Sequence, residues 1–168
     1  MRAPLSRIVA ILPAWRAVGV LIAVLAAPAS PRTQTLPDIA VVVNATVPVD
    51  SLTTAELRRI LLGDREFWTP GARVTLLIRA PIARARDAAI KSVCQMTEAQ
   101  FRQHWIGKVF RADTASGPKI VYSAEMAMDQ VSRVPGAITF IEGPVTSKSV
   151  KVLKIDGKSP GQAGYGLR

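Results

Sequence analysis

The sequence predicts an α/β domain built on one sheet of about five strands, with helices on both faces of that sheet. Two observations lead to this fold class. Short apolar runs of strand length recur along the chain, and segments with helix caps and a helical apolar stripe lie between them. This alternation is typical of a layered fold in which helices cover a central sheet. The runs interpreted as strands are residues 39–44, 74–78, 119–122, 137–141 and 150–155.

Residues 1–29 have the pattern of a signal peptide rather than of a folded element. Three arginines precede a short apolar run at residues 17–26, and Ala27-Pro28-Ala29 fits a cleavage site. The run is shorter than the roughly 20 residues that cross a bilayer, so we expect cleavage and no stable membrane span afterwards. An uncleaved anchor, lengthened by residues 8–12, is the alternative. We therefore expect a periplasmic or secreted protein.

The chain after residue 29 is expected to form one domain, and its composition limits how that domain is held together. Three of the 22 basic residues lie in the targeting segment, so 19 basic and 12 acidic residues remain, a net charge of +7. Cys94 is the only cysteine, which excludes an internal disulfide and suggests a buried thiol. We expect a flexible lead-in at residues 30–38, the domain at residues 39–157 and a disordered, Gly-rich tail at residues 158–168.

The segment from Leu52 to Arg79 carries the clearest local signals. Thr53 and Glu56 are spaced as a capping box, which predicts a helix start. An apolar stripe follows at i, i+3 and i+4 spacing, and Gly63 stands where a left-handed residue ends a helix. The strand at 74–78 then ends on Arg79, at the edge where open α/β sheets bind ligands.

Three more helices are predicted beyond this segment. One carries its apolar stripe between residues 82 and 93, and a second capping box at Thr97 and Gln100 starts the next. Ser123 caps a third, which Pro135-Gly136 stops.

Two of these segments resemble a known family. The stretch ILLGDREFWTPG, followed by a strand ending in Arg79, resembles the second lobe of the phosphate-binding proteins that serve ABC transporters. The stretch VSRVPGAITFI resembles the helix-Pro-Gly-Ala-Ile signature of the same family. The resemblance runs from Ile39 to Gly157. It implies a single three-layer lobe, like one lobe of a type II periplasmic binding protein.

The resemblance also implies a ligand site. In that family a strand-end Arg and the N-terminus of the following helix hold the anion, with a Ser-Gly-Thr group supplying hydroxyls and amides. Here Ala83, Arg84 and Ala85 stand at the positions of that group, and Thr139 replaces a Gly of the family signature. The ligand-binding residues that we expect are Arg79, Ala83, Arg84, Asn44 and Thr139.

Two functions remain open from the sequence. The first is weak binding of phosphate or another small oxyanion, linked to ABC-type uptake through a transporter permease. The alternative is an envelope protein-interaction module that keeps the scaffold without the ligand. We expect no enzyme, cofactor or metal site, because the single His104 has no companion nucleophile or acid at recognisable spacing. The basic residues are scattered without interleaved aromatic residues, so no nucleic-acid partner is expected.

Overall fold

The computed structural model describes residues 36–114 and 117–168, and the predicted signal peptide lies outside this part of the chain. Its central sheet has five strands in the order β6-β5-β7-β1-β8, and each lies within or beside a predicted run. β5 is parallel to β6 and β7, whereas β1 is antiparallel to β7 and β8. The bounds are β1 Ile39–Asn44, β5 Thr75–Arg79, β6 Lys119–Val121, β7 Ala137–Glu142 and β8 Val150–Val152.

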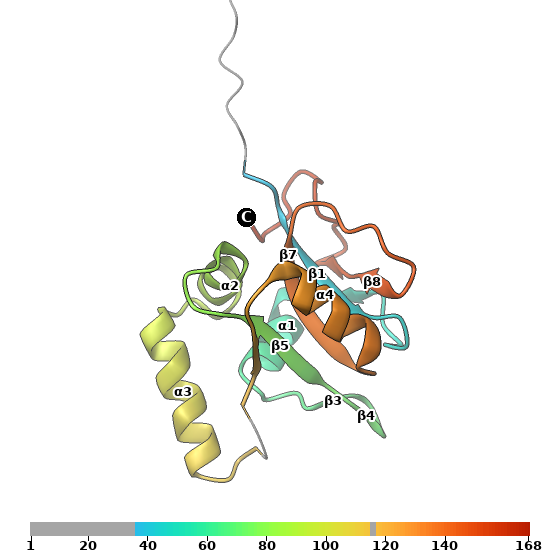
Figure 1. The fold of residues 1–168 in the computed structure, drawn as a ribbon. Helices are drawn as coiled ribbons and strands as arrows, with labels where there is room; N and C mark the ends of the chain where they lie inside the picture. The colour runs from blue at the N-terminus through green and yellow to red at the C-terminus, as the bar shows by residue number, and fades with distance from the viewer. Residues whose placement is uncertain (1–35, 115–116) are drawn as a thin grey trace, which may run out of the picture. The chain divides into compact units, whose positions relative to one another are not determined.

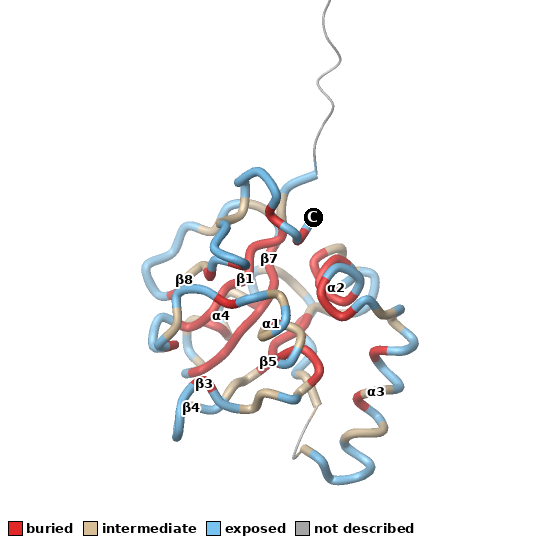
Figure 2. The backbone as a smooth tube through the Cα atoms, turned by 180° about the vertical axis from the view of Figure 1, so that it is seen from behind, coloured by how far each residue is buried: buried red, intermediate tan, exposed pale blue. Residues whose placement is uncertain are grey.

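Helices cover both faces of this sheet, as the sequence predicts. All six residues of β1 are buried, which requires cover on both sides. Figures 1 and 2 show α4 (Ala124–Arg133) on one face and α1 (Thr54–Leu61) on the other, with α2 (Arg84–Ala89) beside α1. Alternate β1 side chains accordingly belong to two separate apolar clusters, one with α1 and α2 and the other with α4. The fold is therefore a three-layer α/β lobe.

The remaining helical residues extend α2 and add a helix at the side of the sheet. A π-helical turn, η1 (Ile90–Cys94), continues α2, and α3 (Glu98–Phe110) follows (Figure 1). Both predicted capping boxes are present, at Thr53 with Glu56 and at Thr97 with Gln100. Gly63 has a φ of 71°, the left-handed conformation that its position predicts.

Short strand pairs complete the fold. β3 (Phe67–Thr69) and β4 (Ala72–Arg73) form a hairpin where the sequence suggests only a loop. Trp68 is buried there and donates from Nε1 to the Gly136 carbonyl oxygen at 2.9 Å. The predicted strand at 150–155 divides into β8 and β9 (Lys154–Ile155), and β9 pairs with β2 (Ser51–Leu52).

The Gly-rich tail differs from its prediction. Residues 158–168 are expected to be disordered, but Tyr165 and Leu167 are buried in the main apolar cluster. The Tyr165 hydroxyl donates to the Ile39 carbonyl oxygen at 2.7 Å, and the Ile39 amide donates to the Leu167 carbonyl oxygen at 3.0 Å. Two apolar anchors and their backbone hydrogen bonds thus outweigh the flexibility that the glycines confer.

Candidate functional site

The carboxyl ends of three parallel strands meet at one edge of the sheet, here called the carboxyl edge. Arg79 ends β5, Val121 ends β6 and Glu142 ends β7. The chain turns directly into α2 after β5 and into α4 after β6, so the first turns of both helices lie at this edge. Open α/β sheets bind their ligands in such a position.

Arg79 reaches this edge with unused hydrogen-bonding capacity. Its Nε is buried and has no hydrogen-bond partner, and Nη2 makes one long contact of 3.5 Å with the Tyr122 carbonyl oxygen. Among the described residues, no carboxylate forms an ion pair with Arg79. A guanidinium with five donors and one weak acceptor nearby is suited to an external anion.

The two neighbouring arginines already have carboxylate partners. Arg86 is 6% exposed and pairs with Glu98 through two contacts, Nε at 2.8 Å and Nη2 at 2.6 Å. Its Nη1 also donates to the Arg79 carbonyl oxygen at 2.9 Å, which fixes the end of β5. Arg84 lies 3.7 Å from Glu142 and donates to the Pro37 carbonyl oxygen at 2.6 Å. Among the described residues, Arg79 is thus the arginine at this edge that forms no ion pair, although Arg84 Nη1 also has no hydrogen-bond partner.

The first turn of α2 is occupied by the chain itself. The Glu142 carboxylate accepts a hydrogen bond from the Ala85 amide at 3.2 Å, and its other oxygen faces Arg84. Ala83 is the N-cap and its side chain makes no capping bond. Ala83 and Arg84, both predicted to contact an anion, therefore lie beside an internal carboxylate.

The other two predicted site residues lie away from Arg79. Because β1 is antiparallel to β7, Asn44 lies at the opposite edge of the sheet. Its amide donates to the carbonyl oxygens of Val131 and Ser132 at 2.8 and 2.9 Å, and so closes the end of α4. Thr139 is fully buried in the middle of β7, and its hydroxyl has no hydrogen-bond partner.

Two acidic residues that the sequence reasoning missed shape the carboxyl edge. Glu142 follows the predicted strand 137–141 directly, so its position at a strand end was a usable signal. Glu125 follows the Ser123 cap by two residues and lies in the first turn of α4. A hydrogen bond with its own amide, a second with Ser123, and to a smaller extent the charge of Arg79 lower the pKa of Glu125.

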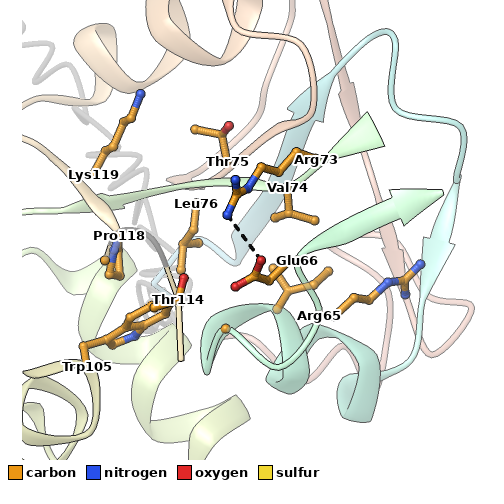
Figure 3. Close-up of a pocket in the computed structure, with 13 residues that line it drawn as sticks. Arg65, Glu66, Arg73, Val74, Thr75, Leu76, Trp105, Thr114, Pro118 and Lys119 are labelled. Carbon is orange, nitrogen blue, oxygen red and sulfur yellow. Dashed lines mark hydrogen bonds and ion pairs between the residues drawn. The ribbon is translucent and has the colours of Figure 1, made fainter. Parts of the chain in front are cut away.

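A hollow of about 230 Å³ lies elsewhere on the lobe (Figure 3). Thr75 and Lys119, the first residues of β5 and β6, line it together with Trp105, so it lies at the end of these strands opposite Arg79. Arg73 and Glu66 pair across its wall at 3.2 Å. The hollow therefore does not belong to the carboxyl edge.

The single histidine and the single cysteine have surroundings typical of residues that stabilise a fold. His104 Nε2 lies 2.9 Å from the Leu62 carbonyl oxygen. Burial raises the pKa of the Cys94 thiol to about 11.

Within residues 36–114 and 117–168, no three His, Cys, Asp or Glu side chains gather in a way that could hold a metal ion. No helix in the same part of the chain is long and apolar enough to cross a membrane.

Comparison with known proteins identifies the scaffold. The structure matches an ABC-type phosphate transport receptor from Vibrio cholerae with a TM-score of 0.59 and 22% identity, over 74% of this chain and 48% of the receptor. It matches PstS from Borrelia burgdorferi with a TM-score of 0.62 and 15% identity, over 79% of this chain and 56% of PstS. The chain has the fold of one lobe of these proteins. It spans about half of their length.

A third match is to a protein from Clostridium perfringens, described as a phosphate ABC transporter substrate-binding protein and solved with bound phosphate. Its TM-score is 0.59 at 20% identity, and the match covers 73% of this chain and 46% of that protein. No protein-family model and no curated sequence matches the chain. The structural likeness confirms the predicted resemblance at the level of the fold.

Proposed function

We propose that the protein is an exported, non-catalytic binding module that holds a small oxyanion such as phosphate weakly at Arg79, in the service of ABC-type uptake. One observation carries this proposal: within the described residues Arg79 forms no ion pair and its buried Nε has no partner, while Arg84 and Arg86 each lie beside a carboxylate. The scaffold shared with phosphate transport proteins and the signal-peptide pattern support it.

The expected affinity is low because few donors converge on the anion. Two or three charge-assisted hydrogen bonds at Arg79 contribute roughly 1.5–3 kcal/mol each, so three bonds near the upper end of this range contribute about 8 kcal/mol. Association costs on the order of 4 kcal/mol or more, so the dissociation constant is about 1 mM or weaker. Glu142 must move before Ala83 and Arg84 can join the site, because its carboxylate holds the Ala85 amide.

A thermal shift titration tests the proposal. At about 20 mM phosphate and a Kd of about 1 mM, ligand binding adds about 1.8 kcal/mol. For a domain of this size the Tm should rise by about 5 °C relative to sodium chloride of equal ionic strength. Arg79→Ala should abolish the rise. Arg59→Ala, which removes an exposed cation from α1, is the matched control and should retain it. Equal shifts in the parent chain and Arg79→Ala would refute the proposal.

An envelope protein-interaction module is the second candidate, and a specific observation favours it. The first turns of α2 and α4 each hold a carboxylate of the chain, from Glu142 and Glu125. Free oxyanions must compete with these internal charges. If phosphate, sulfate and a dicarboxylate all fail to raise the Tm, this second function is preferred.

A further inference from the structure

Exposed apolar side chains lie on the segments that meet at the carboxyl edge. Ile82 is 102% exposed, Tyr122 is 73% exposed and Met126 is 40% exposed. They come from three segments that meet at this point: the turn after β5, the residue after β6 and the first turn of α4. We call these three side chains, with Arg79 and Glu125, the edge patch.

Hydrogen bonds hold the three segments together. The Ala80 amide donates to the Val121 carbonyl oxygen at 2.9 Å, and Arg79 contacts the next carbonyl, that of Tyr122. The Met126 amide donates to the Ser123 hydroxyl at 3.0 Å, which fixes the first turn of α4. The edge patch is therefore built on the ends of two strands and a capped helix.

Ile82 lies at the tip of a tight turn, in which the Ala83 amide donates to the Ala80 carbonyl oxygen at 3.3 Å with Pro81 and Ile82 between them. Its φ of 79° lies in the left-handed region, which a β-branched residue rarely adopts. The side chain is fully exposed, so packing within the lobe does not stabilise it there. A β-branched residue is a rare choice for this position of a turn, and a contact outside the described part of the lobe would account for its exposed apolar side chain. Tyr, Met and Arg are also the residue types that interface centres favour.

The charges of the edge patch make it self-complementary. Arg79 forms no ion pair among the described residues, and its charge is only a minor cause of the lowered pKa of Glu125, the exposed carboxylate in the same patch. In a two-fold dimer, residue i of one copy meets residue j of the other and the reverse contact forms at the same time. We propose that the edge patch binds a second copy of this chain, with Arg79 of each copy paired to Glu125 of the other.

This inference goes beyond oxyanion binding and does not depend on it. A small anion satisfies Arg79 but leaves the three apolar side chains in water, whereas a second copy covers both. Because the dimer and the oxyanion use the same guanidinium, the two compete. Phosphate at about 20 mM, with a Kd of about 1 mM, should therefore weaken the dimer by up to about 400-fold, because both copies must release the anion before they associate.

Sedimentation velocity over a range of protein concentrations tests the dimer. A patch of this size predicts weak association, with dimer at about 0.5 mM chain and monomer at about 5 μM. Arg79→Glu and Glu125→Arg should each weaken the dimer by at least about tenfold. Each substitution is present in both copies, so it breaks both symmetry-related ion pairs at once. The double variant R79E/E125R restores opposite charges and should recover association. Arg59→Glu changes the net charge equally, lies outside the patch and should have little effect.

Ile82→Gly separates docking from folding. Glycine accepts the positive φ, so this variant should melt at a higher temperature while it dimerises less. Tyr122→Ser leaves Arg79 intact, so it should lose dimer but keep any phosphate-induced rise in Tm. A chain that stays monomeric at about 0.5 mM, or a charge swap that fails to recover association, overturns the proposal. If the dimer proposal fails but phosphate still raises the Tm, the oxyanion function stands. If phosphate also leaves the Tm unchanged, both proposals are refuted.

Discussion

Replacement of Asn44 by alanine tests whether this residue contacts a ligand or holds the fold. The side chain is 4% exposed and makes four hydrogen bonds. It donates to the carbonyl oxygens of Val131 and Ser132, and its oxygen accepts from the Thr46 amide at 3.0 Å and from the Thr46 hydroxyl at 2.7 Å. Alanine removes all of these partners at once.

The expected loss follows from the groups left behind. The Thr46 hydroxyl can rotate toward water, but the Thr46 amide and two helix-end carbonyls lose their partner. At about 1 kcal/mol for each of these three groups, Asn44→Ala should lower the free energy of unfolding by about 3 kcal/mol. Asn44→Asp keeps the acceptor for Thr46 but faces a carboxylate toward two carbonyl oxygens, so it should cost at least as much.

Urea unfolding followed by circular dichroism measures this loss, and phosphate titration of the same variants measures the site. We expect a lower midpoint with an unchanged phosphate response below the new melting temperature. A loss under about 1 kcal/mol would show that the hydrogen bonds at the end of α4 contribute little. A stable Asn44→Ala variant whose Tm no longer rises with phosphate would show that Asn44 contacts the ligand rather than only holding the fold.

Further predictions concern three buried groups. Thr139→Val removes a buried hydroxyl that has no partner, so it should raise the free energy of unfolding by up to about 1 kcal/mol; a loss in urea unfolding would contradict this. Cys94 should react with a thiol reagent at pH 8 far more slowly in the native chain than in urea, because its pKa is about 11. Since that pKa is raised on folding from 9.0, the contribution of the thiol to stability is complete below pH 9 and falls between pH 9 and 11; a flat profile there would contradict the assignment. Tyr165→Phe deletes the bond to the Ile39 carbonyl and should cost about 1 kcal/mol, whereas a disordered tail would show no effect.

Local patterns predicted much of the fold because each depends on neighbouring residues. The Thr53 and Thr97 capping boxes, the Gly63 helix end and the apolar runs all use short spacings along the chain. Arg79 at the end of β5 follows from the same reasoning, because a strand boundary places the next polar side chain at the sheet edge. These features needed no knowledge of which strands pair.

The sequence did not reveal features that depend on contacts between residues far apart along the chain. The position of Asn44 depends on the direction of β1, and the sequence leaves that direction open because a buried strand has the same apolar pattern either way. The tail has the composition of a disordered segment, and only the space beside Ile39 accounts for the burial of Tyr165 and Leu167. In each case burial depends on contacts between residues that lie more than 80 positions apart in the sequence.

By itself, the sequence determined the three-layer α/β class, the five strand segments and a cation at the end of β5, because caps, periodicity and strand ends are local properties. Tertiary structure alone decided that Arg79, rather than Arg84 or Arg86, forms no ion pair among the described residues at the carboxyl edge. Glu142 reaches α2 and Glu98 reaches Arg86 only when the strands and helices are packed, so within the part of the chain that the structure describes neither carboxylate pairs with Arg79. Ion pairing depends on distance in space, and spacing along the chain does not encode that distance.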